Sequence, residues 1–253
     1  MNFINIDIQN IDSEGICCAN SNKKGDVCTA SKKAWLRERF QDGMVFKKLN
    51  ARGKVFIEYI PAENAWCPIN ADGYMFIDCF WVSGSFKGKG YGTGLLNACM
   101  EDSKKQGKRG LVAVSSVKKL PFLSEPEFLK KKGFKVADRC APYYELLYLP
   151  FDPAGQAPGF KACVKQAAAE ATGLVLYYTN HCPYNAKYVP LLEAIARDRG
   201  VEFTVHKIST KEQAQAAPVP FTTYSLFYNG RFITNEILSE AKFIKFLEDT
   251  GLI

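Results

Sequence analysis

The run from Trp81 to Leu96 (WVSGSFKGKGYGTGLL) constrains the fold of this chain most, because it places glycine at every second position from Gly88 to Gly94. Glycine lets the backbone turn and approach a ligand closely. The unpaired N–H groups at the start of a following helix, at the positive end of its dipole, bind anions. Lys87 and Lys89 add positive charge to the same loop. The run therefore predicts a loop that holds phosphate.

Sequence patterns on both sides of this loop predict a strand, a loop and a helix in succession. The segment Tyr74–Val82 is apolar and rich in aromatic residues, which is typical of a strand. The segment Gly94–Gln106 carries apolar residues on one helical face and stops at Gly107. A further strand over Gly110–Ser116 and a short helix over Glu125–Lys132 indicate an α/β domain.

Two other phosphate-binding loops fail on spacing. A dinucleotide-binding G-x-G-x-x-G motif would need glycine at Thr93 or at Leu95. A P-loop would need glycine at Ser83 and serine or threonine at Gly90. A glycine-rich turn without a ligand stays open as the structural alternative.

The run Lys87–Gly92 (KGKGYG), followed by Leu95 and Leu96, resembles the pyrophosphate loop of the GNAT N-acetyltransferases, [Q/R]-x-x-G-x-[G/A]. Lys87 departs from the usual Gln or Arg, because it keeps the charge but gives up the planar fork of arginine. The resemblance implies the α+β mixed sheet of that family and acetyl-CoA as co-substrate. The cofactor-binding residues it implies are Trp81, Val82, Lys87, Gly88, Lys89, Gly90, Tyr91, Gly92, Thr93 and Gly94.

A second landmark of the family follows the short helix. Phe128–Phe134 (FLKKKGF) resembles the segment that closes the pantetheine slot in GNAT enzymes. Leu129 stands where many members carry a tyrosine that protonates the leaving thiolate, so that acid is missing from its usual position. Tyr143 and Tyr144 are candidate replacements, and simple packing of both rings in a strand is the alternative.

The resemblance implies direct attack of an acceptor amine on the thioester carbonyl. Backbone N–H groups near a bulge at the end of the Tyr74–Val82 strand would polarise that carbonyl. Asp78 in this strand and Glu58 in the preceding one are the candidate general bases, acting through water. Solvated or structurally paired carboxylates are the alternative for both. The acceptor, a small molecule or a protein, stays open because one GNAT scaffold serves many amines.

The overall composition limits the partners and the compartment. The net charge of +7 comes from dispersed lysine pairs, so the sequence does not predict a nucleic-acid partner. No segment approaches the apolar length of a membrane span, and the N-terminus lacks the features of a signal peptide. The nine cysteines contain no C-x-x-C pair, which predicts reduced thiols, a cytoplasmic location and no metal cofactor. The oligomeric state stays open.

The chain changes character between Leu149 and Gly173, where prolines and glycines break the pattern. We expect a first domain over residues 1–150, a linker with a short helix over 151–172, and a second domain over 173–253. The second domain shows the order of the thioredoxin and glutaredoxin fold, a smaller α/β unit. Its elements are expected at Leu174–Thr179, from Asn180 to about Arg199, at Val201–Ile208, in a short helix capped by Ser209 and Glu212, in a hairpin of Ser225–Tyr228 and Arg231–Thr234, and at Glu240–Asp249.

In the thioredoxin fold the chemistry sits where the first strand meets the first helix, here at Cys182. A thiolate at a helix N-terminus has a lowered pKa, so Cys182 is a candidate reactive thiol. Pro220 resembles the cis-proline that faces the reactive cysteine in that fold. Asn185 stands in place of a resolving cysteine, which excludes a dithiol cycle.

Both halves together resemble a GNAT acetyltransferase followed by a YoaP-type domain of thioredoxin-like shape, over nearly the whole chain. Stretches such as Lys54–Pro61 and Tyr177–Pro183 support the resemblance. Two alternatives to an acetyltransferase stay open. One is a monothiol glutaredoxin-like oxidoreductase with a CoA-binding domain, and the other is a CoA-binding interaction protein without catalysis.

Overall fold

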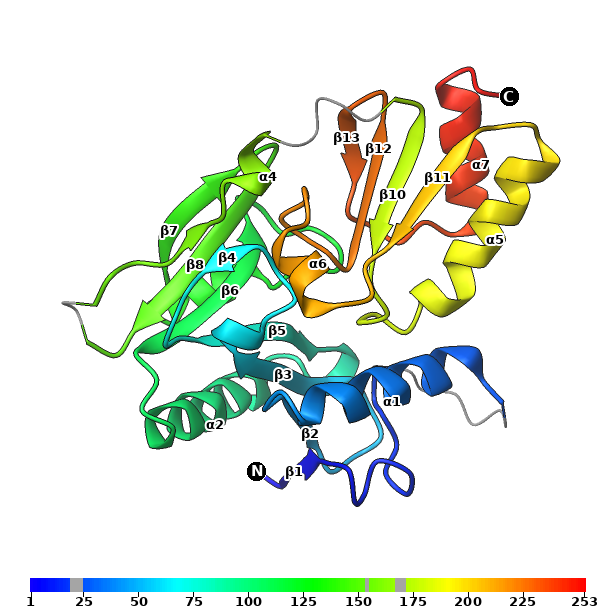
Figure 1. The fold of residues 1–253 in the computed structure, drawn as a ribbon. Helices are drawn as coiled ribbons and strands as arrows, with labels where there is room; N and C mark the ends of the chain where they lie inside the picture. The colour runs from blue at the N-terminus through cyan, green and yellow to red at the C-terminus, as the bar shows by residue number, and fades with distance from the viewer. Residues whose placement is uncertain (19–24, 153–154, 167–171) are drawn as a thin grey trace.

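Two sheets of different size organise the chain, with one seven-stranded sheet in the first half and one four-stranded sheet in the second (Figure 1). The computed structural model describes residues 1–18, 25–152, 155–166 and 172–253. The large sheet has the order β1-β2-β3-β5-β6-β8-β7, and the small sheet has the order β11-β10-β12-β13. A third, two-stranded sheet joins β4 to β9.

The elements of the first half are β1 (Phe3–Ile6), α1 (Val27–Phe40), β2 (Val45–Leu49), β3 (Val55–Pro61), the 3-10 turn η1 (Ala62–Asn64), β4 (Ile69–Asn70), β5 (Met75–Val82), the 3-10 turn η2 (Gly84–Phe86), α2 (Tyr91–Lys105), β6 (Gly110–Ser116), α3 (Pro126–Lys131), β7 (Lys135–Cys140) and β8 (Tyr144–Pro150). Those that follow are β9 (Gly159–Phe160), α4 (Cys163–Gln166), β10 (Leu174–Tyr178), α5 (Asn185–Asp198), β11 (Phe203–Lys207), α6 (Lys211–Gln215), β12 (Tyr224–Tyr228), β13 (Arg231–Thr234) and α7 (Glu240–Asp249).

Strands β5 and β6 diverge in the middle of the large sheet. They pair in parallel at two positions, Met75 with Leu111 and Phe76 with Val112. Both strands run on well beyond this point, to Val82 and Ser116. Because this pairing stops early, the carboxyl-terminal part of β5 has no strand paired to it on the β6 side, while β3 stays paired on its other side as far as Val82. We call the open side the gap between β5 and β6.

A β-bulge lies on β5 beside this gap. The pairing with β3 passes from Glu58 opposite Cys79 to Tyr59 opposite Ile77, so Asp78 is the extra residue. The bulge lies at mid-strand, whereas the sequence predicts one at the strand end. A bulge bends the strand and changes the direction of a side chain. Here it presents the Asp78 carboxylate on the same side as Glu58.

Helix α2 begins at Tyr91, three residues earlier than its apolar pattern predicts. Its N-cap is Gly90, which has φ of +80° and ψ of −2°. This left-handed conformation suits glycine, and it turns the chain directly from the loop into the helix. The glycine-rich run is therefore partly the first turn of α2.

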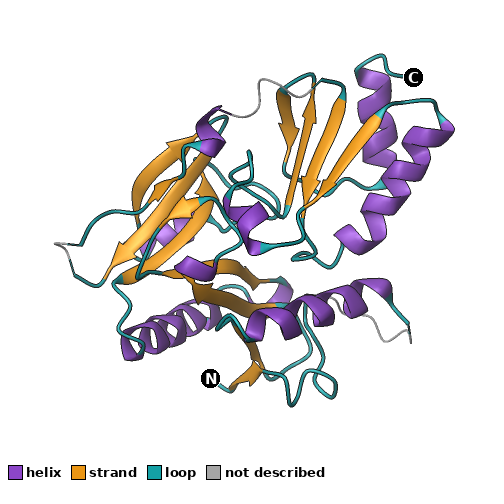
Figure 2. Ribbon diagram, in the orientation of Figure 1, coloured by secondary structure: helices purple, strands orange, loops and turns teal. Residues whose placement is uncertain are grey.

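The second half has helices α5 and α7 together on one side of its sheet, and α6 lies between the two sheets (Figures 1 and 2). Strands β10 and β11 are parallel, while β12 is antiparallel to both β10 and β13. The predicted elements are confirmed to within two residues at most ends. The capping box of α6 consists of Thr210 and Gln213, not of Ser209 and Glu212, because the helix starts one residue later.

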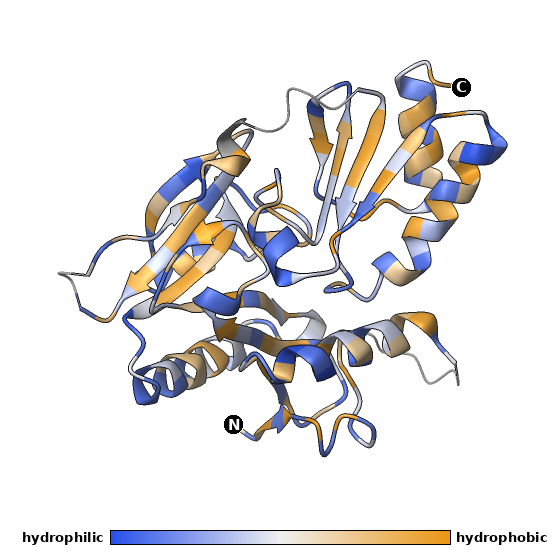
Figure 3. Cartoon of the chain, viewed as in Figure 1, coloured by the Kyte–Doolittle hydropathy of each residue, from blue (hydrophilic) through white to orange (hydrophobic). Residues whose placement is uncertain are grey.

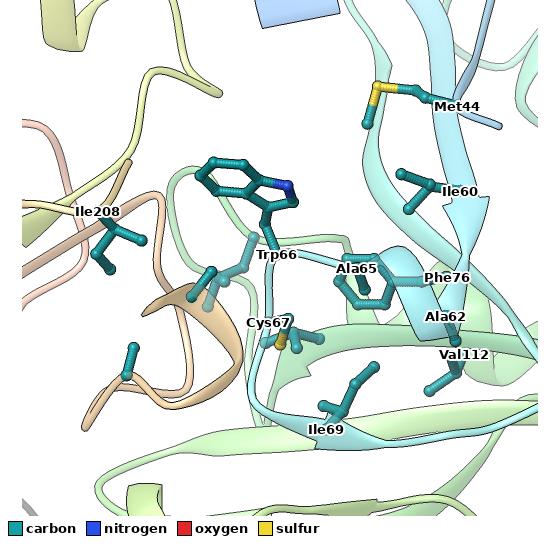
Figure 4. Packing of buried hydrophobic residues seen from close by; sticks show 14 of the residues in the cluster. Met44, Ile60, Ala62, Ala65, Trp66, Cys67, Ile69, Phe76, Val112 and Ile208 are labelled. Carbon is teal, nitrogen blue, oxygen red and sulfur yellow. The ribbon is translucent and has the colours of Figure 1, made fainter. Parts of the chain in front are cut away.

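The buried hydrophobic residues that the structure describes form three clusters, and one of them spans both halves. Figure 3 shows apolar residues along the strands of both sheets. One cluster of buried residues includes Trp35, Phe56 and Trp66 from the first half together with Val219 and Phe227 from the second. Figure 4 shows the Trp66 ring between Ile208 on one side and Met44 and Ile60 on the other. The apolar surfaces of the two halves therefore stabilise each other.

The predicted linker is partly structured. Strand β9 pairs with β4 of the first half, Ile69 opposite Phe160 and Asn70 opposite Gly159. Helix α4 covers the first part of the alanine-rich stretch, and residues 167–171 of the predicted linker helix lie outside the described residues. No helix in the described part of the chain is both long and apolar enough to cross a membrane.

Candidate functional site

A cavity of about 600 Å³ lies along the glycine-rich loop. Seven of the ten predicted cofactor-binding residues line it: Val82, Lys87, Gly88, Gly90, Tyr91, Gly92 and Thr93. Phe86, Phe128, Lys119 and Lys131 complete much of the wall. The N–H groups at the start of α2 and Lys87 supply donors and positive charge that suit a pyrophosphate, while Glu125 and Glu127 also line the cavity and Glu125 pairs with Lys119 at 2.9 Å.

The other three predicted residues lie outside this cavity. Lys89 and Gly94 do not line it, and Trp81 lines a second cavity. Gly94 packs against the N-terminal strand, where a Cβ would lie 2.6 Å from the sulfur of the exposed Met1 side chain and 3.1 Å from the Phe3 ring. Gly92 faces the cavity, where a Cβ would come within 3.3 Å of the Phe128 ring.

The second cavity, about 310 Å³ in volume, lies between the two halves of the chain. From the first half it receives Glu58, Asp78 and aromatic side chains of β3 and β5. From the second half it receives the segment 181–184 together with Phe221 and Thr223. Phe80 lines both cavities. The cavity along the glycine-rich loop, called the cofactor-side cavity below, and the interdomain cavity are therefore neighbours at Phe80 of β5, beyond the end of the pairing with β6.

Four charged or ionisable groups meet at the floor of the interdomain cavity. Lys32 Nζ lies 2.7 Å from Glu58 Oε2 and also donates to the His181 carbonyl at 2.9 Å. His181 Nε2 lies 3.2 Å from Glu58 Oε2 and 3.4 Å from Asp78 Oδ2. Its Nδ1 lies 3.0 Å from the hydroxyl of Thr223. The second half thus places an imidazole between the two carboxylates of the first.

The two carboxylates have opposite tendencies to ionise. Burial opposes the charge on Glu58, but Lys32 and His181 outweigh it and hold the pKa of that carboxyl below its ordinary value. Burial raises the pKa of Asp78, and the negative charge of Glu58 acts in the same direction, against His181 and Lys32. Glu58 is therefore a fixed anion, while Asp78 is the carboxyl better able to exchange a proton.

Glu58, Asp78 and His181 also offer three metal-ligand atoms within 4.8 Å of one another. The Lys32 ammonium, however, lies against the same Glu58 oxygen. His181 Nε2 is also engaged by both carboxylates, at 3.2 Å from Glu58 Oε2 and 3.4 Å from Asp78 Oδ2, so these three ligand atoms already pair with one another. We therefore interpret the group as a hydrogen-bonded charge cluster.

Tyr143 and Tyr144 do not reach the site, so the prediction that either serves there as an acid is wrong. Neither lines the two cavities. The Tyr143 hydroxyl donates to Asn235 Oδ1 at 2.5 Å, and Tyr144 is buried against Tyr143 and Phe232. Both rings pack where β8 meets the second half. Leu129 is fully buried in the core beneath α2.

Cys182 lines the interdomain cavity, but its predicted activation is wrong. Burial raises the pKa of the Cys182 thiol to about 11 and outweighs its position near the start of α5. Pro220 does not follow a cis bond, since among the described residues the cis peptide is Ala141–Pro142. The Asn185 side chain donates to the carbonyls of Thr179 and Thr223 at 2.9 and 2.7 Å, which is a structural role.

The sequence interpretation missed His181 and Lys32. His181 is one of only two histidines in the chain and immediately precedes Cys182. A rare histidine close to the predicted start of a helix is the one sequence signal that could have identified this residue. Lys32 is followed by a second lysine, Lys33, in a predominantly polar helix. Nothing in the local sequence indicates that the Lys32 side chain is fully buried.

The chain belongs to the GNAT acetyltransferase family. It is 41% identical, over 247 residues that cover 98% of each protein, to the "Uncharacterized N-acetyltransferase YoaP" of Bacillus subtilis (strain 168). The family described as "Acetyltransferase (GNAT) family" matches residues 24–121, and the one described as "YoaP-like" matches residues 202–245.

Solved structures of GNAT proteins are more distant. The PaiA N-acetyltransferase of Thermoplasma acidophilum in complex with coenzyme A is 14% identical, covers 60% of this chain and all of its own, and has a TM-score of 0.41. A GNAT acetyltransferase of Brucella melitensis in complex with acetyl-CoA is 15% identical, covers 64% of this chain and 96% of its own, and has a TM-score of 0.38. The family assignment rests on the Bacillus relative.

Proposed function

We propose that this protein transfers the acetyl group of acetyl-CoA to a primary amine by direct attack in a ternary complex. The observation that carries the proposal is that Phe80 lines both cavities, on the part of β5 beyond its pairing with β6. One cavity is lined by the glycine-rich loop together with lysines, Glu125 and Glu127, and the other by Glu58, Asp78 and His181. We infer that donor and acceptor approach each other beside Phe80, each from its own cavity.

The cofactor-side cavity suits acetyl-CoA. Lys87 and the N–H groups at the start of α2 would hold the pyrophosphate, with Gly88 and Gly90 allowing close backbone approach. Phe128 and Val82 would contact the pantetheine arm. Backbone N–H groups of β5 along the gap, where pairing with β6 has ended, are available to polarise a thioester carbonyl.

Acetyl transfer forms a bond between the amine nitrogen and the acetyl carbon and breaks the bond from that carbon to sulfur, which leaves as a thiolate. Asp78 is the residue that we assign to accept the proton from nitrogen, directly or through one water, because its pKa is raised and its carboxylate lines the acceptor cavity. Glu58 stays ionised and orients Lys32 and His181.

The leaving thiolate does not require an acid in contact with it. A thiol has an ordinary pKa of about 8.5, so its thiolate is stable enough to leave near neutral pH and to take a proton from solvent afterwards. The loss of a tyrosine at Leu129 is compatible with this mechanism.

We further propose that residues 1–150 form the catalytic domain, 151–172 the connection and 173–253 a thioredoxin-like domain. The order of β11, β10, β12 and β13, with parallel β10 and β11, supports the last of these. The raised pKa of Cys182 counts against a monothiol oxidoreductase, because a thiol needs to ionise to react. Nine free cysteines support a reducing, cytoplasmic location.

The test combines acetyl-CoA binding with a panel of amines. Calorimetry measures binding, and release of the CoA thiol measures transfer. Amine-dependent thiol release that falls strongly in Asp78→Asn, with acetyl-CoA affinity unchanged, is the expected result. Tight acetyl-CoA binding without thiol release for any amine would instead support a non-catalytic CoA-binding protein.

A further inference from the structure

One oxygen of Glu58 in the interdomain cavity has no hydrogen-bond partner among the described residues. Glu58 is fully buried, and its Oε2 takes both Lys32 and His181. Its other oxygen, Oε1, receives no hydrogen bond from any described residue. A buried charged acceptor without a donor is costly, so this oxygen points to a ligand that donates hydrogen bonds.

The charge of the floor favours a cation as that donor. Lys32 pairs with Glu58 at 2.7 Å, and Lys54, which also lines the cavity, donates to the Tyr184 hydroxyl. Among the described residues no lysine or arginine forms an ion pair with Asp78, so an ionised Asp78 carboxylate is the negative charge that a bound cation would offset. A primary ammonium ion carries one positive charge and three N–H donors. Carboxylate oxygens of Glu58 and Asp78 lie within 4.8 Å of each other, so one ammonium group can donate to both residues.

The walls above this floor are apolar. Phe56, Trp81 and Phe122 come from the first half, and Pro183, Tyr184 and Phe221 come from the second. The volume of about 310 Å³ lies at the low end of the range for small-molecule sites, which is roughly 300 to 1,000 Å³. The body of the ligand is therefore compact and hydrophobic.

The second half covers part of this cavity. Lys54 Nζ donates to the Tyr184 hydroxyl at 2.9 Å across the two halves. Asn235 Nδ2 donates to the Pro121 carbonyl at 2.8 Å. These bonds join the two halves at residues that line the cavity, Lys54, Tyr184 and Pro121, which favours a small ligand over a folded polypeptide.

We propose that the acceptor is a compact primary amine with an apolar body, bound as its ammonium ion between Glu58 and Asp78 under the second half of the chain. This proposal rests on the proposed acetyl transfer. It assigns the second half a direct role, because Phe221, Pro183 and Tyr184 select the body of the acceptor.

The decisive experiment is calorimetry of two matched ligands, 2-phenylethylamine and 2-phenylethanol, on the full chain with and without CoA. The amine is expected to bind at least about tenfold tighter, as a charge-assisted hydrogen bond implies. In Asp78→Asn the amine is expected to lose most of that advantage, while the affinity for the alcohol stays unchanged. The alcohol thus serves as the control for an intact cavity. Equal affinity of wild type for both ligands would overturn the ammonium site.

A second variant tests the apolar wall. Phe221→Gln is expected to weaken both ligands several-fold, whereas Phe246→Gln, at a partly buried phenylalanine of α7 that lines neither cavity, is expected to change neither. CoA affinity is expected to be unchanged in both. Faster thiol release with spermidine or a lysine-containing peptide than with 2-phenylethylamine would overturn this acceptor class and leave acetyl transfer intact. Binding of Zn²⁺ in preference to the amine would overturn it too. Lack of CoA binding would instead contradict the proposed function, and amine binding without CoA would still test the ammonium site.

Discussion

Replacement of Lys32 by methionine tests the buried charge cluster most sharply. The side chains of Lys32 and Glu58 are each only 1% exposed, and their charged atoms lie 2.7 Å apart. Removal of one partner from a buried ion pair leaves the other charge uncompensated, which costs roughly 3 to 5 kcal/mol. For a chain of this size each kcal/mol lowers the melting temperature by about 2 to 4 °C, so Lys32→Met is expected to lower it by about 6 to 20 °C.

The neighbouring lysine provides a matched control. Lys33 Nζ lies 3.9 Å from Asp12 Oδ1, and the Asp12 side chain is 76% exposed. Surface pairs of this kind contribute only about 0 to 1 kcal/mol. Lys33→Met, the same substitution one residue along α1, is therefore expected to change the melting temperature by a few degrees at most.

The cost of Lys32→Met is also expected to depend on pH. In the wild type the pKa of Glu58 is held below its ordinary value, so this carboxylate stabilises the folded state above about pH 4.3 and loses that effect as pH falls. Without Lys32, burial is expected to dominate and to raise the pKa of Glu58. The folded state of the variant therefore loses less stability at a pH where Glu58 begins to take up a proton. The difference between variant and wild type is expected to be largest near pH 7 and smaller at pH 5. Differential scanning calorimetry at both pH values measures it, and a loss no larger than that of Lys33→Met would refute the reasoning.

Four other outcomes are expected. Gly90→Val is expected to abolish acetyl-CoA binding in calorimetry, because φ of +80° is strained for a β-branched residue. Lys87→Ala is expected to weaken that binding by about 1 to 3 kcal/mol. Unchanged affinity in Gly90→Val would contradict the assignment of the loop. The kcat/KM for acetyl transfer is expected to rise with pH through the raised pKa of Asp78, since the carboxylate accepts the proton. Asp78→Asn is expected to lose both this rise and most of the activity. An unaltered pH profile in the variant would exclude Asp78 as the base. Cys182→Ser is expected to retain acetyl transfer. In the wild type Cys182 is expected to alkylate slowly below pH 9, because the pKa of its thiol is about 11. Loss of transfer with normal CoA binding in Cys182→Ser would point to an acyl-thioester on Cys182. A protein of residues 1–150 alone is expected to aggregate in size-exclusion chromatography, because the buried cluster that holds Trp35 and Trp66 loses the apolar residues that the second half contributes. A soluble fragment that binds CoA would show that the first half folds independently.

Local patterns in the sequence predicted most of the elements. The strand over Gly110–Ser116, the hairpin across Asn229-Gly230 and the helix Glu240–Asp249 lie where periodicity and turn residues predict them. The start of α2 was predicted too late, because glycine is a poor helix former by propensity and the fold nevertheless uses three of them at the helix start.

The site was only partly predictable, because its geometry depends on how the two halves dock. Glu58 and Asp78 were identifiable as carboxylates within apolar strands. Their contact with His181 could not be predicted, since Glu58 and His181 are 123 residues apart and meet across the interface. The same docking partly buries Cys182 and raises its pKa, which reverses the expectation drawn from its position near a helix start.

The most direct test of the central claim is thiol release from acetyl-CoA with a primary amine such as 2-phenylethylamine, with the product identified by mass spectrometry. We predict release that saturates in both acetyl-CoA and amine and yields the N-acetylated amine in equal amount. The account would be contradicted if acetyl-CoA bound to the chain but no amine, small or peptide, raised thiol release above the rate in buffer.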